Sequence, residues 1–153
     1  MQELTYKELS KDEKKLIDSA EGALKTAYSP YVKSYVAAAV LTNSGKIISG
    51  GCFGNSSSGV GICAERAAVV TANSLGERKI KALAVIKKSE EKKAEPFTPC
   101  GVCRQFLLEI TQITGKDLVI LSSNQDKTKI IKTSIHELLP YPYSRFSRRV
   151  ARK

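Results

Sequence analysis

The sequence predicts an α/β fold, a three-layer α/β/α sandwich built around a mixed five-stranded sheet. Helical and strand patterns alternate along the chain in the order helix, two strands, helix, strand, helix, two strands, helix, which is typical of a sheet layered with helices. The chain has 153 residues, 42% of them hydrophobic, and a chain of this size buries enough apolar surface for one compact domain. Because no internal repeat or linker interrupts the pattern, we expect a single domain over residues 1–153.

The first helix should begin at a capping box, in which Ser10 is followed three residues later by Glu13. Apolar residues then recur at helical spacing from Leu16 to Ala27, and Ser29-Pro30 ends the pattern. This pattern predicts an amphipathic helix that packs one face on the sheet.

Two strands are expected next, at residues 35–41 and 46–49. Between them, Asn43-Ser44-Gly45 supplies residues that tolerate the positive φ angles of a tight hairpin turn. A loop rich in glycine and serine follows from residue 50 to residue 61.

The middle of the chain predicts two helices on either side of a buried strand. The first of these helices should cover residues 63–75, and the apolar residues 80–87 should form the strand. After a polar loop, Pro99 is well placed to open the next helix, which Gly115 ends.

The last two strands are expected at residues 118–121 and 129–133. A second capping box, Ser134 with Glu137, then opens a short helix that Pro140 ends. From about residue 144 the chain continues as a basic tail, whose charges are Arg145, Arg148, Arg149, Arg152 and Lys153.

The net charge of +10 makes nucleic acid a possible partner, because clustered lysines and arginines displace counterions from phosphates. The distribution of the charge does not favour this partner. Lysines between residues 87 and 93 alternate with glutamates, as on a solvated surface. Only the tail is a true cluster, and it is compatible with disorder, with packing on a neighbouring subunit or with an acidic partner.

Nothing in the sequence indicates a membrane partner. No apolar run approaches the roughly 20 residues that cross a bilayer, and the N-terminal residues are too polar for a secretory signal. We therefore expect a cytoplasmic protein. Four cysteines in a chain of this length, two of them in a Cys-x-x-Cys pair, favour metal or redox chemistry over a disulfide framework.

Three cysteines form a candidate zinc site. Cys100 and Cys103 lie three positions apart at a predicted helix start, so that both sulfurs share one face of the first turn, and Cys63 lies at another predicted helix start. The positive end of a helix dipole favours thiolate, the form that binds metal. Three thiolates at roughly 2.3 Å leave one tetrahedral position of Zn²⁺ open for water, as in catalytic sites.

Glu65 is the candidate catalytic residue. Because it follows Cys63 by two positions, it points well round the helix from the cysteine and is better placed as a base than as a ligand. Cys63-Ala64-Glu65 and Pro99-Cys100-Gly101-Val102-Cys103 fit a signature of zinc deaminases, in which the glutamate is the general acid and base.

Other interpretations of these cysteines stay open. The Cys-x-x-Cys pair could be redox-active. Cys52 could close the metal shell of a purely structural zinc site, or the cysteines could be ordinary core residues at chance spacing. The single histidine, His136, is expected to be a solvated or capping residue.

Together these motifs resemble the cytidine deaminase family of small zinc enzymes, from the first helix to about Tyr143. Residues 61–66 (Gly-Ile-Cys-Ala-Glu-Arg) and 99–105 (Pro-Cys-Gly-Val-Cys-Arg-Gln) match its two zinc segments. Residues 28–31 (Tyr-Ser-Pro-Tyr) resemble its opening motif, and residues 137–143 (Glu-Leu-Leu-Pro-Tyr-Pro-Tyr) resemble its C-terminal motif.

The resemblance implies a homotetramer, one Zn²⁺ per chain and hydrolytic deamination of a cytosine-type ring, with cytidine or deoxycytidine as the first candidate substrate. It implies that Glu65 moves the protons and that Arg66 offsets the negative charge of three thiolates. It also implies that Ala64 and Thr98 meet the ring through their backbones. Tyr143, in the C-terminal motif, is a further candidate for substrate binding.

The sugar end departs from the family's pattern. Cys52, Gly54 and Ser58 occupy the positions of its asparagine, glutamate and tyrosine. Ser34 stands where an aromatic residue is expected, whereas Asn55 is retained. Cys52, Gly54 and Asn55 are therefore the candidate sugar contacts. The alternatives are a deaminase of a modified cytosine nucleoside such as blasticidin S, a nucleic-acid-binding or editing protein, and a non-catalytic structural zinc protein.

Overall fold

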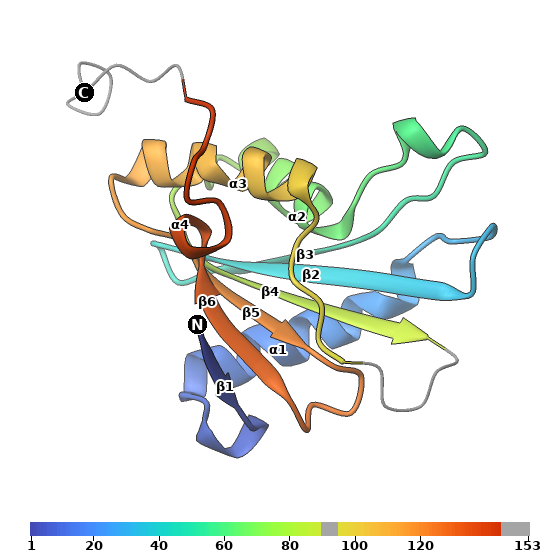
Figure 1. Ribbon diagram of the computed structural model, residues 1–153, viewed down its shortest axis with the longest axis horizontal. Helices are drawn as coiled ribbons and strands as arrows, with labels where there is room; N and C mark the ends of the chain where they lie inside the picture. The colour runs from blue at the N-terminus through green and yellow to red at the C-terminus, as the bar shows by residue number, and fades with distance from the viewer. Residues whose placement is uncertain (90–94, 145–153) are drawn as a thin grey trace.

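One mixed β-sheet runs through the middle of the molecule (Figure 1). The computed structural model describes residues 1–89 and 95–144. In this part of the chain the strands lie in the order β1-β6-β5-β4-β2-β3. Only β4 and β5 pair in parallel, and the other neighbours are antiparallel. The bounds are β1 Gln2–Leu4, β2 Ser34–Thr42, β3 Ile47–Gly51, β4 Ile80–Ser89, β5 Val119–Ser123 and β6 Ile130–Ser134.

The described part of the sheet has six strands, so the prediction of five was wrong. The additional strand is β1, which pairs with β6 through Gln2 and Lys132 and through Leu4 and Ile130. Residues 2–4 are too few to show a strand pattern of their own. They are extended because the edge of β6 offers backbone hydrogen-bonding groups that a further strand can pair with.

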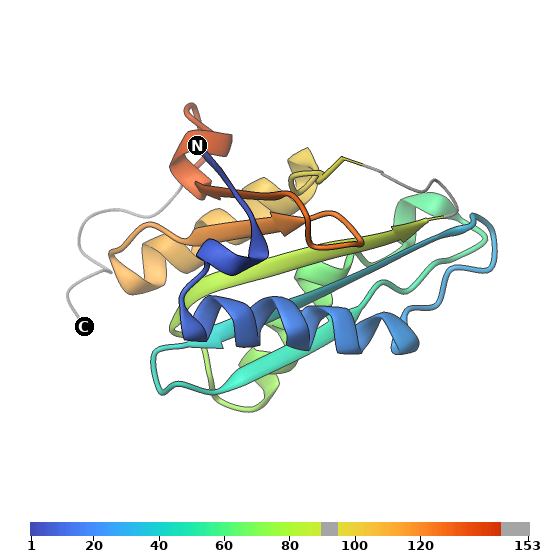
Figure 2. The same cartoon turned by 90° about the horizontal axis from the view of Figure 1, so that it is seen from below.

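Helices cover both faces of the sheet, which confirms the three-layer α/β/α sandwich. Helix α1 (Lys11–Ala23) lies against one face, whereas α2 (Ala64–Ser74) and α3 (Gly101–Thr114) lie beside each other on the opposite face (Figures 1 and 2). The short helix α4 (Ile135–Leu138) follows β6 and contacts α3.

Strand β2 shows how the two apolar layers are separated. Ala38 and Val40 pack into the core under α2 and α3, whereas Ala37, Ala39 and Leu41 pack into the core under α1. All five side chains are buried. This alternation follows from the two-residue period of a strand, and a run that is apolar throughout is typical of a strand buried on both faces.

Both predicted capping boxes are present. Ser10 accepts a hydrogen bond from the backbone N–H of Glu13 at the start of α1, and Ser134 accepts one from Glu137 at the start of α4. In the turn between β2 and β3, Gly45 takes the positive φ angle, at 89°.

Most elements lie where the sequence predicts them, with strand ends shifted by at most two residues. Helix α1 is the main exception, because it stops at Ala23 and the chain then tightens into a 3₁₀ turn over Leu24–Thr26. The other 3₁₀ turns, Tyr6–Glu8 and Ser58–Val60, lie in connecting segments.

Strand β3 lies very close to its neighbours, and two glycines allow this. A Cβ atom on Gly50 would lie 2.7 Å from the backbone nitrogen of Ala68 in α2, and one on Gly51 would lie 2.7 Å from that of Ala27. A strand glycine commonly marks such a close backbone approach. The end of β3 is therefore held between α2 and the segment after α1, at the point where the chain enters the loop of residues 52–62.

Two expectations fall outside the described residues: the basic tail at 145–153 and the part of the polar loop at 90–94. Within residues 1–89 and 95–144, no helix has the length and apolar character needed to cross a membrane.

Candidate active site

Three cysteine sulfurs meet at the N-terminal ends of α2 and α3. Cys63 is the N-cap of α2, Cys100 is the N-cap of α3, and Cys103 lies in the first turn of α3. Their Sγ atoms all lie within 4.8 Å of one another. Among the residues that the structure describes, this is the only group of three or more side chains arranged to hold a metal ion.

The arrangement fits a zinc ion. Thiolates about 2.3 Å from a tetrahedral zinc ion lie about 3.8 Å apart, a separation inside the 4.8 Å within which these sulfurs all lie. Cys103 is buried, Cys63 is half-buried and Cys100 is exposed. An ion held by the three would therefore face an opening, with one tetrahedral position left for another ligand.

The surroundings of the sulfurs favour a thiolate at Cys63. The Cys103 thiol donates a hydrogen bond to it and the Arg66 guanidinium lies beside it, and together they lower the pKa of Cys63 to about 5. The pKa of Cys103 is raised, first because its proton is held in this hydrogen bond and then because its side chain is buried. A metal ion would replace such shared protons, since metals bind deprotonated thiols.

Arg66 is anchored beside the sulfurs from the first turn of α2. Its Nη2 donates to the backbone carbonyl of Gly61 at 2.9 Å, which fixes the guanidinium while it stabilises the thiolate of Cys63. A fixed positive charge at this place counters the excess negative charge of three thiolates on a divalent ion.

Glu65 is the second residue of α2 and is buried, with 2% of its surface exposed. Burial raises the pKa of its carboxyl group, and the negative charge of Cys63 raises it further. A carboxyl group with a raised pKa binds a proton more readily, which suits a group that accepts protons and returns them.

A cavity of about 320 Å³ opens beside Glu65, Cys63 and Cys100. Glu65 is the only carboxylic acid in its lining, and no lining residue carries an amine or a guanidinium. The other lining residues are Ser29, Val32, Ser34, Val36, Cys52, Phe53, Gly54, Ser58, Gly61, Ile62, Ala64 and Phe97.

Three of the predicted substrate contacts do not line this cavity. Asn55 uses its Oδ1 to accept the backbone N–H of Ser57 at 2.9 Å, which closes a turn within the loop. The hydroxyl of Thr98 accepts a hydrogen bond from Arg104, and Tyr143 is bound through its backbone to Gln105. Their roles in substrate binding stay predictions.

Cys52 and Gly54 do line the cavity, in a loop that is held against residues 28–30. The backbone N–H of Tyr28 donates to the Cys52 carbonyl at 2.8 Å, and the N–H of Gly54 donates to the Tyr28 carbonyl at 2.7 Å. A Cβ atom on Gly54 would lie 3.1 Å from that same Tyr28 oxygen. The missing side chain at position 54 is therefore part of how the loop packs.

The remaining candidate ligands lie apart from the three sulfurs. Cys52 is half-buried, and its sulfur does not belong to the three-sulfur group. His136 is on the surface, where its Nδ1 lies 3.0 Å from the carboxylate of Asp117. Neither arrangement supports a fourth protein ligand on the ion.

Sequence reasoning missed several apolar residues of the lining, among them Val36 and Phe97. Val36 lies near the start of β2, and the strand period that places Ala38 and Val40 under α2 and α3 also places Val36 on this face. Phe97 lies in the irregular segment before α3 and packs against the same core. A single aromatic residue in an otherwise polar loop was the only signal for it.

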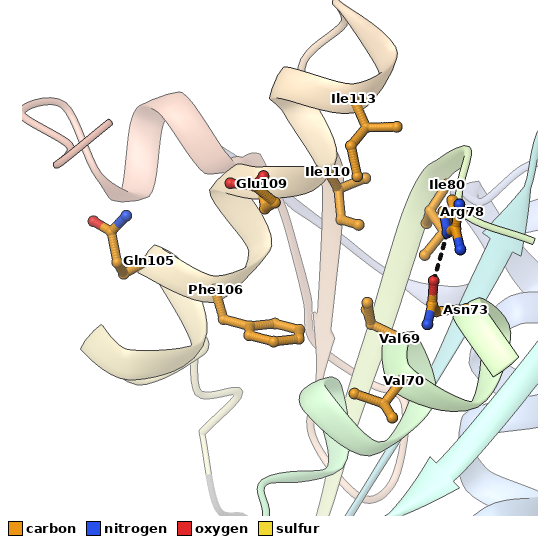
Figure 3. A pocket seen from close by; sticks show the side chains of 10 residues that line it. All are labelled: Val69, Val70, Asn73, Arg78, Ile80, Gln105, Phe106, Glu109, Ile110 and Ile113. Carbon is orange, nitrogen blue, oxygen red and sulfur yellow. Dashed lines mark hydrogen bonds between the residues drawn. The ribbon is translucent and has the colours of Figure 1, made fainter. Parts of the chain in front are cut away.

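A second and larger hollow, of about 470 Å³, lies between α2 and α3 (Figure 3). Apolar side chains from both helices line most of it, with Val69 and Val70 facing Phe106, Ile110 and Ile113. It contains neither the cysteines nor a buried carboxyl group, and so the chemistry belongs to the smaller cavity.

The geometry of the smaller cavity defines a class of protein. Three thiolates can hold one metal ion with an open position, and a buried carboxyl group that binds protons lies next to them. This combination of ligands and a proton-binding carboxyl group is typical of a zinc-dependent hydrolase that activates water.

Comparison with known proteins identifies the family within that class. A family model described as "Cytidine and deoxycytidylate deaminase zinc-binding region" matches residues 10–120. A cytidine deaminase of Sporosarcina psychrophila is 39% identical over 134 residues, covering 88% of this chain and 93% of that protein. A probable cytidine deaminase of Dictyostelium discoideum is 38% identical over 130 residues, covering 85% of this chain and 82% of that protein. The chain belongs to the cytidine deaminase family.

A solved structure agrees with this result. The crystal structure of cytidine deaminase from Burkholderia pseudomallei matches with a TM-score of 0.75 at 34% identity, covering 88% of this chain and 100% of the other. The protein is thus a zinc-dependent hydrolase, and cytidine deamination is its expected activity. These findings favour zinc hydrolysis over the redox and structural interpretations of the cysteines.

Proposed function

We propose that the cavity binds an uncharged cytosine nucleoside and deaminates it, with Glu65 as the proton carrier. The observation that carries this proposal is the burial of Glu65 beside three clustered sulfurs at the edge of one cavity. When bound, zinc acts as a Lewis acid that activates water for attack on the ring carbon. Orientation of the ring and movement of the protons fall to the protein's own side chains and backbone.

Glu65 carries two protons in this proposal. The reaction forms a C–O bond at C4 of the ring and breaks the C–N bond to the amino group. Glu65 takes one proton from the attacking water and gives it to the ring nitrogen N3. It then moves the proton of the new hydroxyl group to the amino group, which leaves as ammonia. The raised pKa of the buried carboxyl group supports this role, because Glu65 must hold a proton between transfers.

Backbone groups at the helix starts orient the ring. Ala64 lines the cavity and is the first residue of α2, where a backbone N–H has no acceptor inside the helix. This N–H is the proposed donor to the ring carbonyl. The backbone of Thr98, which lies between the lining residues Phe97 and Cys100, is the proposed partner of the amino group.

The lining of the cavity favours a substrate without a phosphate. A phosphate buried there would meet no lysine or arginine of this chain, and burying an unpaired charge is costly. Ser34, Ser58 and Cys52 offer only hydroxyl and thiol groups to a sugar, and neutral hydrogen bonds contribute about 0.5–1.5 kcal/mol each. The site should therefore accept free nucleosides and discriminate weakly between ribose and deoxyribose.

Ammonia release from zinc-loaded protein tests this proposal on cytidine, deoxycytidine, deoxycytidylate, cytosine and blasticidin S. We expect kcat/KM for the two nucleosides to agree within about tenfold, because a tenfold change corresponds to about 1.4 kcal/mol, or one neutral hydrogen bond. Deoxycytidylate should be slower than either nucleoside by at least about tenfold. Zinc-stripped protein is the control. Preferred turnover of deoxycytidylate would contradict the free-nucleoside proposal, and preferred turnover of blasticidin S would favour the modified-nucleoside alternative.

We also propose that the protein is a homotetramer. Two separate apolar surfaces are exposed on the chain: the groove between α2 and α3, and the border of the cavity at Tyr31, Val32, Phe53, Val60 and Ile62. Large exposed apolar surfaces commonly mark contacts with other proteins. Two surfaces that each contact their own copy build a tetramer with D2 symmetry, in which a neighbour could complete the cavity.

Sedimentation equilibrium should give about four times the chain mass of 16.7 kDa. Ile113→Lys should lower this mass, because it places a charge in the apolar groove between α2 and α3. Lys116→Ala, an exposed change just beyond the same helix, should leave the mass unchanged. A monomeric wild-type protein would contradict the proposal.

A cytoplasmic location is consistent with this site. Zinc-binding thiols must stay reduced, the four cysteines are free in the structure, and reduced cysteines are typical of the cytosol. The location stays a prediction, as does the nucleic-acid alternative, which is based on the net charge of +10.

A further inference from the structure

Arg104 lies near the proposed metal site, and its guanidinium group has no part in the proposed mechanism. It is the residue after Cys103 in α3, and all three of its nitrogens donate hydrogen bonds. Nε donates to the Pro99 carbonyl at 2.7 Å, and Nη2 donates to the Thr98 hydroxyl at 2.8 Å. Nη1 donates to the Leu138 carbonyl at 3.1 Å. One side chain thus connects two segments that are far apart in the sequence.

Two of these acceptors lie in the segment that leads to Cys100. Residues 95–99 have no regular secondary structure, and Pro99 is buried. A buried carbonyl without a hydrogen-bond donor would cost free energy. Pro99 also has no backbone N–H through which it could pair with another strand. Because Cys100 follows Pro99 directly, the hydrogen bond from Arg104 fixes the backbone just before a proposed metal ligand.

The third acceptor is the carbonyl of Leu138, the last residue of α4, and the C-terminal segment that leaves α4 there passes α3 (Figure 1). Gln105, the next residue of α3, holds the same segment. Its Nε2 donates to the Tyr143 carbonyl at 2.7 Å, and its Oε1 accepts the Tyr143 N–H at 3.2 Å. Arg104 and Gln105 therefore attach residues 138–143 to the start of α3.

Arg104 and Arg66 differ in the groups that they contact. Arg66 is the guanidinium that lowers the pKa of Cys63. The three hydrogen bonds of Arg104 all go to neutral oxygens, two carbonyls and one hydroxyl. Its contribution is therefore one of geometry.

We propose that Arg104 is a positioning residue that sets the direction of the Cys100 sulfur through Thr98 and Pro99 and links it to the C-terminal segment through Leu138. A guanidinium presents its N–H groups in one rigid plane, so that the acceptors keep fixed relative positions. Lysine carries the same charge without this planar fork, and so charge alone should not preserve the function. The inference rests on the proposed metal site and not on the identity of the substrate.

The rate at which zinc-loaded protein transfers its metal to a colorimetric chelator tests this role. Arg104→Lys and Arg104→Met should both release zinc at least about tenfold faster than wild type, because each lost hydrogen bond from a charged donor corresponds to roughly tenfold or more. Thr98→Val, which removes one acceptor at similar size, should accelerate release by about two- to tenfold. The matched control is Gln105→Ala, which frees Tyr143 but leaves residues 98–100 held. Its rate should stay within about twofold of wild type.

Equal rates in wild type and folded Arg104→Lys would overturn the proposal. Zinc release from Gln105→Ala that is as fast as from the Arg104 variants would also overturn it. The faster release would then result from detachment of the C-terminal segment and not from the loss of the Arg104 hydrogen bonds. If circular dichroism shows that the Arg104 variants do not fold, Thr98→Val becomes the test. Zinc release from Thr98→Val at the wild-type rate would then overturn the proposal. A wild-type protein that holds no zinc would overturn both the metal site and this inference, whereas unchanged release in the variants overturns this inference alone.

Discussion

Cys100→Ala should purify without zinc and without measurable deamination. Structural zinc sites with four ligands bind their ion with about 10–16 kcal/mol, so one thiolate contributes roughly 3 kcal/mol, or about two powers of ten in affinity. A three-ligand site has no spare ligand to compensate. The measurement is zinc per chain by elemental analysis after gel filtration, with ammonia release on the same samples.

Cys52→Ala is the matched control for this experiment. Cys52 is half-buried in the same cavity, but its sulfur lies outside the three-sulfur group. This variant should keep about one zinc per chain, as expected for three other ligands. Stoichiometric zinc in Cys100→Ala would contradict the ligand assignment. Loss of zinc in Cys52→Ala would instead favour the closed, four-thiolate structural site.

Glu65→Gln should have the opposite combination of effects, with zinc retained and turnover lost. The amide has nearly the shape of the carboxyl group but cannot carry protons between water, ring nitrogen and amino group. Because general acid and base catalysis contributes typically about 10²–10⁴-fold, kcat should fall by at least that factor. Zinc content and circular dichroism should match those of wild type.

Glu21→Gln provides the control for an equivalent change elsewhere. Glu21 lies on α1, on the far face of the sheet, where its carboxylate pairs with Lys127 at 2.7 Å. An exposed ion pair of this kind contributes little to stability, and kcat should be unchanged. If Glu65→Gln retained wild-type turnover, another group would have to move the protons.

The metal site could be predicted because its residues are close in sequence and lie at recognisable helix starts. Cys100 and Cys103 are one helical turn apart, and the N-caps of α2 and α3 lie within one residue of the predicted helix starts. The meeting of the two helix starts was inferred from the shared chemistry of cysteines, since no local pattern brings residue 63 to residue 100. The structure supplies that proximity through the parallel pair β4 and β5 and the helices packed over it.

What the sequence could not predict depends on contacts between distant segments. Strand β1 exists because the edge of β6 is available, and its three residues carry no strand pattern. The hydrogen bond from Arg104 to Leu138 spans 34 positions in the chain, and no sequence pattern at either residue predicts it. For Asn55 the structure adds a local contact that its motif did not predict, since its Oδ1 closes a turn within the loop, and its role as a sugar contact stays a prediction.

The close approach of Gly54 to Tyr28 also constrains which side chains this pocket accepts without a backbone shift. A side chain at position 54 would meet a carbonyl oxygen that the residue's own N–H binds at 2.7 Å. A carboxylate side chain there would therefore require the Tyr28 carbonyl to shift by a few tenths of an ångström. Position 52 already carries a side chain and is free of this constraint. Substitutions that tighten sugar binding are therefore accommodated more readily at position 52 than at position 54.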